Sequence, residues 1–264
     1  MNNINQTLYI PLYGKAYVSQ KGIILNDKQA EKIWSKEGFT LKGKAKSKWL
    51  AYYMGMRSAV IDNWLKQRLE HYEDAVVLHL GAGLDSRVLR INDCKHEWYD
   101  VDYPSVIELR KQYYQENNNY HMIGANVLDE TWLNGITKGR AIIVMEGLSM
   151  YLKHDELNTL LLRLSEYFDS LEIIMDSYTT KAAKISKYKN PINDVGVNIV
   201  YGFDDPKSFN NAKLVYYTEH NITPNIYIDE LKGLERIIFK RVFAGKLSHN
   251  LYRLYEFRNK TTTI

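Results

Sequence analysis

The sequence predicts an α/β fold built on a seven-stranded, mostly parallel sheet with helices on both faces. Three patterns support this prediction: helical periodicity over the first seventy residues, short apolar strands alternating with helices from residue 75, and two late strands separated by one helix. Alternating strands and helices pair in parallel through right-handed crossovers, and we expect the last strand to be antiparallel. The 264 residues fit one domain, because single cores stop growing near roughly 250 to 300 residues.

Residues 1–72 are expected to form an N-terminal helical layer. Asp27 is placed to cap a helix that runs through Trp34. A second helix from Trp49 to Leu69 carries apolar residues at three- and four-residue spacing, namely Tyr53, Met56, Val60, Ile61, Trp64 and Leu65.

Residues 73–180 are expected to form the core of the sheet. Its strands are predicted at Val76 to Leu80, Glu97 to Val101, His121 to Gly124, Ala141 to Met145 and Leu171 to Asp176. The helices between them are predicted at Pro104 to Glu116, Glu130 to Ile136 and Lys153 to Phe168. Pro104 suits a first helical turn, since it has no N–H to leave unpaired there.

Residues 181–212 are interpreted as a lid or substrate region, and residues 213–264 as C-terminal strands and a helix. The basic, polar stretch from Thr179 to Asn198 indicates a helix or lid. It is followed by an apolar run from Lys213 to Tyr217, a helix near Asp229 to Phe239 and an alternating strand from Leu251 to Phe257. The two strands can pair as an antiparallel edge of the sheet.

Composition excludes several classes of protein. A hydrophobic fraction of 45% and a charged fraction of 25% are ordinary for a globular chain. The net charge of +4 comes from scattered basic residues, so we expect no nucleic-acid partner. Cys94 is the only cysteine, which rules out an internal disulfide and two-cysteine metal patterns; we expect no metal and a cytoplasmic setting. Neither a signal peptide nor a long apolar run is present, so we expect no membrane span.

The run AVVLHLGAGLDSR, residues 75–87, is typical of a strand that ends in a nucleotide-binding turn. Glycine lets the backbone approach a ligand because it has no Cβ. The third glycine of a dinucleotide fingerprint is missing, and the turn carries Asp85, which is unfavourable beside a diphosphate. S-adenosylmethionine has no phosphate, and its sulfonium and amino groups suit a nearby carboxylate. The turn therefore favours S-adenosylmethionine over NAD, with a purely structural turn as the remaining alternative.

Asp102 ends the second predicted strand, 21 residues after Gly81. A carboxylate there can accept hydrogen bonds from both ribose hydroxyls of a nucleoside. Asp100 is a rival on the same side of the strand, but Asp102 is nearer the carboxyl edge, where ligands bind in open α/β sheets. The structural alternative is that Asp102 caps the helix that begins at Pro104.

Polar residues also follow the third and fourth strands. Asn126 can pair with an adenine edge, and its alternative is an Asx turn that begins a helix. Glu146 comes directly after five apolar residues at a carboxyl edge. A carboxylate there is costly unless it meets a cation or a donor, which the methionine portion of the cofactor would supply.

Taken together, these segments resemble the leucine carboxyl methyltransferase family, and more closely its branch similar to the tetracenomycin polyketide O-methyltransferase. The resemblance is carried by LHLGAGLDSR, WYDVDYPSVIELR, VLDETW and MEGLSMYL in this order, and by TLYIPLYGKAYVS and LNDKQAEKI near the N-terminus. It spans most of residues 7 to 178. The chain from Lys181 onward resembles the family only loosely, through NIVYGFDD.

The resemblance implies a class I S-adenosylmethionine-dependent methyltransferase fold and a cofactor site carried over position by position. It implies Gly81, Ala82 and Gly83 at the amino acid portion, Asp102 at the ribose, Asn126 and Val127 at the adenine, Glu146 near the methionine end, and Lys15 and Arg57 at the cofactor carboxylate. A guanidinium suits a carboxylate. From the residues alone, Lys15 and Arg57 would be solvated charges. Many family members have Asp at the position of Asn126.

The expected reaction is in-line transfer of a methyl group from the sulfonium to an oxygen of a small polyketide-like or aromatic acceptor. A carboxylate acceptor needs no general base because it is already ionised, whereas a phenol would be helped by one, for which His154 and Tyr151 are candidates. A Tyr-rich lid (Tyr178, Tyr188, Tyr201, Tyr216 and Tyr217) suits an aromatic acid better than a protein C-terminal carboxylate. A nicotinamide-dependent oxidoreductase and a non-catalytic S-adenosylmethionine-binding regulator are the alternatives.

Overall fold

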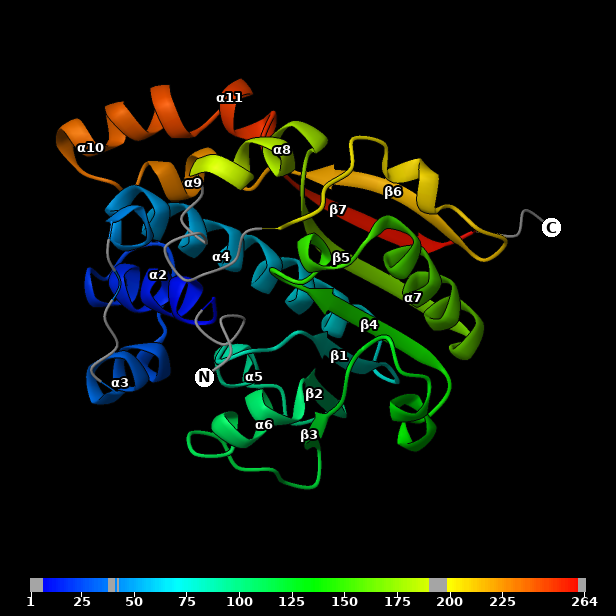
Figure 1. The fold of residues 1–264 in the computed structure, drawn as a ribbon. Coiled ribbons are helices and arrows are strands. Elements are labelled where there is room, and N and C mark those ends of the chain that lie inside the picture. Colours follow the sequence, from blue (N-terminus) through cyan, green and yellow to red (C-terminus); the bar gives the residue numbers. More distant parts are fainter. Residues whose placement is uncertain (1–6, 38–40, 42, 190–198, 261–264) are drawn as a thin grey trace.

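A twisted seven-stranded sheet in the order β3-β2-β1-β4-β5-β7-β6 forms the centre of the computed structural model, which describes residues 7–37, 41, 43–189 and 199–260 (Figure 1). The strands are β1 (Val76–Leu80), β2 (Trp98–Asp102), β3 (Tyr120–Gly124), β4 (Arg140–Met145), β5 (Ser170–Tyr178), β6 (Leu214–His220) and β7 (Tyr252–Asn259). Strand β7 runs antiparallel to both of its neighbours, β5 and β6, and the pairs among β1 to β5 are parallel. The predicted seven-stranded sheet with an antiparallel last strand is confirmed.

The N-terminal layer consists of α2 (Tyr9–Gln20), α3 (Lys28–Glu37), the 3-10 turn η1 (Gly43–Lys46) and α4 (Lys48–His71). Asp27 caps α3 as predicted, because its Oδ1 accepts a hydrogen bond from the Ala30 N–H at 2.8 Å. Glycines let α2 and α4 approach closely: a Cβ at Gly55 would lie 2.8 Å from the Val18 side chain. The two predicted helices therefore exist, and they pack tightly against each other.

The core helices differ from the sequence expectation in length. They are α5 (Arg87–Ile91), α6 (Pro104–Arg110) and α7 (His154–Tyr167), with the 3-10 turns η2 (Thr131–Gly135) and η3 (Ser149–Tyr151). The helix predicted to reach Glu116 ends at Arg110, because the Asn-rich stretch before β3 forms a turn closed by the Asn117 to Tyr120 bridge. The helix predicted at 130–136 is only a 3-10 turn, which ends at Gly135.

Helices cover both faces of the sheet, as predicted. Alternate strand residues point to opposite faces. Val77 and Ile142 pack with the N-terminal layer and α6, whereas Leu78 and Ile143 pack with α7 and η2. The long helix α4 crosses the first of these faces in Figure 1, and α7 lies along β5. The carboxyl ends of β1 and β4 therefore lie beside the N-terminal layer.

The C-terminal third adds α8 (Thr180–Lys189), η5 (Pro206–Phe209), α9 (Asn225–Ile228), α10 (Gly233–Ile238), the π-helical turn η6 (Phe239–Phe243) and α11 (Lys246–His249). The helix predicted near 229–239 begins instead at Gly233 and continues through η6. Phe243 stacks on Trp49 with ring centroids 5.2 Å apart, so η6 packs on α4. Residues 190–198 of the predicted lid lie outside the described part of the chain. In the part that is described, no helix combines the length and the apolarity that crossing a membrane requires.

Candidate cofactor site

A cavity of about 530 Å³ opens at the carboxyl ends of β1 and β4, under α2, α4 and η6. One side of it, which we call the floor, carries charges and glycines: Lys15, Arg57, Gly81, Ala82, Gly83, Asp85 and Glu146. The other side, which we call the wall, is mainly apolar and aromatic: Trp49, Leu50, Tyr53, Met54, Tyr151, Tyr178, Phe243 and Leu251. Six of the nine predicted site residues therefore line one cavity.

The glycine turn of the floor is held by hydrogen bonds to β2. Gly81 donates its N–H to the Val101 carbonyl at 2.8 Å, and Gly83 donates its N–H to Asp102 Oδ2 at 2.8 Å. Both glycines have positive φ, +69° and +53°, which side-chain-bearing residues rarely adopt. A Cβ at Gly83 would also lie 2.9 Å from Leu8. Glycine is therefore required here by the backbone.

Asp102 lies at the end of β2 with both carboxylate oxygens fixed by backbone. Oδ1 accepts from the Tyr103 N–H at 2.7 Å, and Oδ2 accepts from Gly83. Burial raises the pKa of Asp102, and these two N–H groups oppose that effect. The N-cap of α6 is Tyr103, so the capping alternative for Asp102 is wrong. Asp102 presents a fixed acceptor beside the glycine turn.

Asp100, the rival acid, is part of the core. It is buried and accepts hydrogen bonds from Arg110 and, at 2.6 Å, from the Tyr120 hydroxyl. Burial opposes the ionisation of Asp100, but the Arg110 guanidinium beside it lowers its pKa to about 2. Asp100 is 0% exposed and Asp102 is 8% exposed, so Asp102 is the more accessible of the two acids for a ribose.

Asn126 and Val127 follow β3, outside the residues that line the cavity. Asn126 Oδ1 accepts from the Leu128 N–H at 3.1 Å, so the predicted Asx turn is present. Val127 is buried, and its carbonyl accepts from Trp132 Nε1 at 3.2 Å. The Ala125 N–H donates to the Asp102 carbonyl at 2.8 Å, which ties this turn to the end of β2. An adenine role for Asn126 and Val127 stays a prediction.

Lys15 and Arg57 are not solvated charges. They are 2% and 4% exposed, and they converge on acids of the floor. Lys15 Nζ lies 2.8 Å from Asp85 Oδ2 and 3.7 Å from Glu146 Oε1. Arg57 donates to Glu146 Oε1 at 2.8 Å and to Asp176 Oδ2 at 2.7 Å. The structure therefore brings together Lys15, Arg57 and Glu146, although Arg57 and Glu146 are 89 residues apart in sequence and Lys15 lies still farther from Glu146.

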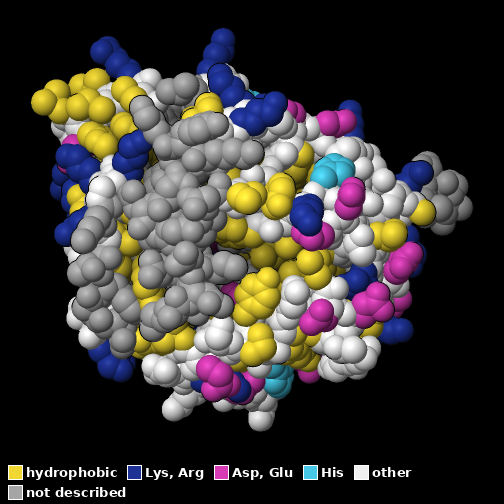
Figure 2. Space-filling model, viewed as in Figure 1, with side chains coloured by type: hydrophobic (Ala, Val, Ile, Leu, Met, Phe, Trp, Pro, Cys, Tyr) yellow, Lys and Arg dark blue, Asp and Glu magenta, His cyan; other side chains and the backbone are white. Residues whose placement is uncertain are grey.

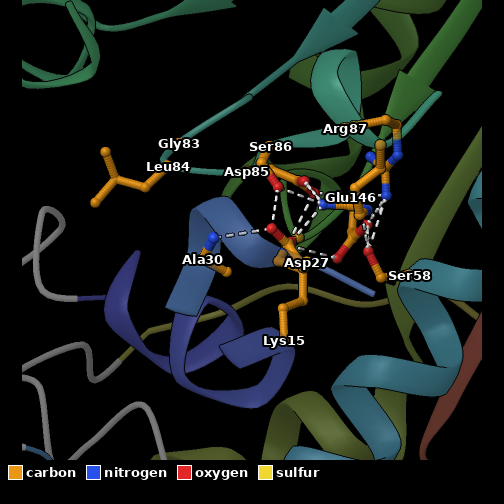
Figure 3. Close-up of polar contacts among 12 residues, drawn as sticks. Lys15, Asp27, Ala30, Ser58, Gly83, Leu84, Asp85, Ser86, Arg87 and Glu146 are labelled. Carbon is orange, nitrogen blue, oxygen red and sulfur yellow. Dashed lines mark hydrogen bonds and ion pairs between the residues drawn. The ribbon is translucent and has the colours of Figure 1, made fainter. Parts of the chain in front are cut away.

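Two further arginines complete this network: Arg87, which is labelled beside Glu146 in Figure 3, and Arg90. Arg87 is fully buried and donates to Glu146 and, at 2.7 Å, to Asp62 Oδ1. Arg90 donates to Asp85 Oδ1 at 2.7 Å and to Asp27 Oδ2 at 2.8 Å. The cations that Glu146 requires are therefore supplied by the protein, whereas the sequence suggested that the cofactor supplies one.

These cations keep the floor acids ionised. Burial alone would raise the pKa of Glu146, but Lys15, Arg57 and Arg87 hold the pKa of its carboxyl well below its usual range. The same balance holds for Asp85. Burial opposes its ionisation, but Arg90 and Lys15 lower its pKa well below the ordinary value. The floor therefore presents fixed negative charge beside fixed positive charge.

Arg57 retains one donor for a ligand. Its Nη1 and Nη2 are bonded to Asp176, Tyr252 and Glu146, but among the described residues its buried Nε has no hydrogen-bond partner. A buried unsatisfied donor is costly, and a ligand carboxylate would satisfy it. Glycine backbone, a free guanidinium donor and fixed carboxylates fit the amino acid portion of S-adenosylmethionine.

The wall comes from other residues than the predicted Tyr-rich lid. Of the four tyrosines whose side chains are described, Tyr178 alone lines the cavity. Tyr216 packs against Tyr255, and Tyr217 lies under Arg258. Tyr201 is half-buried and does not line the cavity, and the side chain of Tyr188 is outside the described part. The expectation failed because residues of α4 and η6 reach the cavity instead.

The two candidate bases are not supported as bases. His154 is exposed at the start of α7 and packs on Phe209 with ring centroids 4.5 Å apart, outside the cavity lining. Tyr151 lines the cavity, but burial raises its pKa, so its hydroxyl stays protonated at neutral pH. His79 also lines the cavity, with Nε2 3.1 Å from Arg87 Nη1, where it accepts a hydrogen bond.

Sequence reasoning assigned no role to Arg87, Asp176 or Tyr252. Asp176 had a detectable signal, since it follows an apolar run at a carboxyl edge as Glu146 does. Tyr252 had none: its hydroxyl donates to Asp176 Oδ2 at 2.6 Å across 76 residues of sequence.

Comparisons with known proteins identify related sequences. A family model described as leucine carboxyl methyltransferase matches residues 6–165. The tetracenomycin polyketide synthesis O-methyltransferase TcmP of Streptomyces glaucescens is 31% identical over 211 residues, which cover 79% of this chain and 78% of the relative. The S-adenosyl-L-methionine-dependent methyltransferase dpfgK of Gibberella zeae is 27% identical over 231 residues, which cover 78% of each chain.

Solved structures share the fold at low sequence identity. Magnesium protoporphyrin IX methyltransferase from Synechocystis PCC 6803, with bound SAH, has a TM-score of 0.53 at 10% identity and covers 88% of this chain and 93% of that one. A SAM-dependent methyltransferase from Anabaena variabilis has a TM-score of 0.51 at 10% identity, with coverage of 77% and 84%. The predicted class I methyltransferase fold is confirmed.

Proposed function

The chain belongs to the leucine carboxyl methyltransferase family, and on this premise we propose that it forms methyl esters on small aromatic or polyketide-like carboxylic acids. It is an enzyme, an S-adenosylmethionine-dependent methyltransferase. The family fixes the cofactor, whereas the acceptor is our inference from the cavity.

The residues of the floor and the neighbouring strand ends are suited to hold the cofactor. In the proposed arrangement, Arg57 Nε and Lys15 bind its carboxylate, the backbone of the glycine turn lies against its amino acid portion, and Asp102 accepts from the ribose. Asn126 and Val127 would contact the adenine, and Glu146 would face the methionine end. When bound, the cofactor supplies an electrophilic methyl group on a sulfonium.

The wall supports an apolar, aromatic acceptor. Its side chains include Trp49, Tyr53 and Phe243, and aromatic rings favour stacked or edge-on contacts with another ring. A protein C-terminus is the weaker candidate, because Lys44 is the one cation among the cavity-lining described residues outside the floor. The wall would position the acceptor and exclude water.

The observation that carries the choice of a carboxylate is that no base in the described cavity lining is free: Asp85 and Glu146 are ionised but paired with the floor cations. Tyr151 and Tyr53 have a raised pKa because of burial, and His79 Nε2 accepts from Arg87. A phenol must lose a proton to become a good nucleophile, whereas a carboxylic acid is ionised well below neutral pH. The site therefore suits an acceptor that arrives already charged.

Transfer of a radiolabelled methyl group to matched acceptors tests this proposal. A panel would pair each aromatic carboxylic acid with its phenol analogue of the same ring system. We expect label on the acids, released by mild alkali because the product is an ester. Alkali-stable label on the phenols alone would overturn the carboxylate assignment and leave the methyltransferase assignment in place.

A further inference from the structure

The helical segment from α10 through η6, residues 233–243, is apolar on two sides. Its inner side packs on the N-terminal layer, where Phe239 is buried in edge-to-face contact with Tyr52 and Phe243 stacks on Trp49. Glu235 also points inward, since it accepts hydrogen bonds from Lys48 and Tyr52. These contacts fix the orientation of the segment, so its outer side is a defined surface.

That outer side carries large apolar side chains that the fold does not cover. Leu234 is 74% exposed, Ile237 45%, Ile238 40% and Val242 48%, and Ile226 of the neighbouring α9 is 71% exposed. Leu234, Ile237 and Ile238 recur at the three- and four-residue spacing of one helix face. Figure 2 shows hydrophobic side chains gathered with Lys and Arg at the edge of the molecule where α10 lies in Figure 1. Contiguous exposed apolar surface marks an interaction site.

Basic side chains surround these apolar residues. Exposed cations lie at Lys232, Arg236, Lys240, Arg241 and Lys246, and none of them forms an ion pair within the described ranges. The one acid inside residues 233–243, Glu235, is neutralised from the inner side. We call the five apolar residues above and these five cations the α10 face. Within residues 226–246 the one exposed acid is Asp229, so the α10 face carries an excess of positive charge although the whole chain has a net charge of only +4.

We propose that the α10 face docks on an anionic lipid surface. An amphipathic helix that combines exposed aliphatic residues with Lys and Arg lies in the plane of a membrane interface and is attracted by negative lipids. A second copy of this chain fits less well, because a two-fold contact would bring the same cations against one another. Val242 belongs to the α10 face and also lines the cavity, so docking would turn the cavity entrance toward the lipid.

Vesicle sedimentation of the full chain tests this proposal. The two probes are vesicles of phosphatidylcholine alone and of phosphatidylcholine mixed with phosphatidylglycerol. We expect a partition coefficient at least about tenfold higher on the mixed vesicles, and a decline of that excess as salt is raised. The Leu234→Ser/Ile237→Ser and Lys240→Glu/Arg241→Glu double variants should each lose most of this binding.

Matched variants elsewhere on the surface serve as controls. Leu89→Ser removes an aliphatic side chain of α5 that is 53% exposed, and Lys66→Glu/Lys95→Glu reverses two exposed charges away from the α10 face. Both should bind vesicles as the wild type does. Retained S-adenosylmethionine binding shows that every variant is folded and keeps this test separate from the proposed function.

Three results would overturn the proposal. Equal partition of the wild type on the two kinds of vesicle is the first, and equal loss in the control variants is the second. The third is concentration-dependent dimerisation of the wild type, without vesicle binding, that Leu234→Ser/Ile237→Ser abolishes; the α10 face would then be an interface between copies.

Discussion

The floor and the wall line the same cavity but are built on different principles. The floor is a network of buried ion pairs in which Glu146 meets Lys15, Arg57 and Arg87. The wall is made of rings and aliphatic groups such as Trp49 and Phe243, which pack by contact. Ion pairs of this kind need fixed geometry and tolerate little change, whereas apolar packing accepts substitutions of similar volume.

In the proposed function, this difference separates the two ligands of the enzyme. The charged floor would hold the cofactor, and the apolar wall would hold an apolar acceptor. Changes in the floor should therefore reduce cofactor affinity, and changes in the wall should reduce acceptor turnover.

The largest effect is expected from Glu146→Gln. The change leaves three buried cations without their shared carboxylate, so S-adenosylmethionine affinity should fall about a hundredfold, as measured by calorimetric titration. Glu172→Gln is the matched control, because Glu172 is a buried acid on β5 paired with Arg68 at 2.6 Å, outside the cavity lining. Glu172→Gln should lower the stability of the fold and leave S-adenosylmethionine affinity unchanged. An equal loss of affinity in both variants would contradict a specific role of the floor in cofactor binding.

A somewhat smaller effect is expected from Arg57→Lys. The variant keeps the positive charge but loses Nε, the donor that has no partner among the described residues, so affinity should fall roughly thirtyfold. Decarboxylated S-adenosylmethionine sharpens this prediction. The wild type should bind the carboxylated form more tightly, and the variant should discriminate little between the two forms. An unchanged preference in the variant would show that Arg57 does not bind the cofactor carboxylate.

Asp102→Ala should lower S-adenosylmethionine affinity by about tenfold, since it removes hydrogen-bond acceptors for the ribose. Asp100→Asn is its neighbour control, with an expected loss of stability and no loss of affinity, because Asp100 is bonded to Arg110 and Tyr120. Titration of the folded variants distinguishes the two. An Asp102→Ala protein with wild-type affinity would show that the ribose is bound elsewhere.

A change in the wall should act on the other ligand. Phe243→Ala removes a ring stacked on Trp49, so we expect kcat/KM for the acceptor to fall about fivefold with S-adenosylmethionine affinity within about twofold of wild type. Initial rates at saturating cofactor measure the first quantity. A loss of cofactor affinity larger than the loss of acceptor efficiency would contradict the separation.

The smallest effect concerns pH and differs in sign between the two regions. The pKa of Glu146 is lowered from 4.5, so the stability it contributes is present above that value and is lost as the pH falls. Burial raises the pKa of Tyr53 from 10.0, so its contribution is lost as the pH rises above 10. In urea denaturation, the free energy of unfolding should depend less on pH on the acid side for Glu146→Gln and on the alkaline side for Tyr53→Phe. The opposite pairing of variant and pH range would refute this assignment.

The sequence could predict the sheet and much of the floor because both depend on local patterns. Apolar runs define the strands, and the residue that ends each run, such as Asp102 or Glu146, falls at the carboxyl edge of the sheet. Lys15 and Arg57 could not be read from local patterns, since each finds its partner through the packing of α2 and α4 on the sheet. Only the family resemblance pointed to them.

The wall was beyond prediction for a related reason. Phe243 reaches Trp49 across almost two hundred residues, and the π-helical turn that carries it has no sequence signature of its own. Two of the tyrosines that looked suitable, Tyr216 and Tyr217, lie on β6 outside the cavity lining, because composition indicates chemistry and says nothing about which cavity a side chain faces. Tertiary packing therefore determines which side chains form the wall.

The claim that cofactor affinity resides in the floor is tested most directly by titrating S-adenosylmethionine into Glu146→Gln, Phe243→Ala and the protein with both changes. We predict that the double variant binds as weakly as Glu146→Gln alone and that Phe243→Ala binds as the wild type does. A Phe243→Ala protein that loses as much affinity as Glu146→Gln, or a Glu146→Gln protein that loses none, would contradict the account.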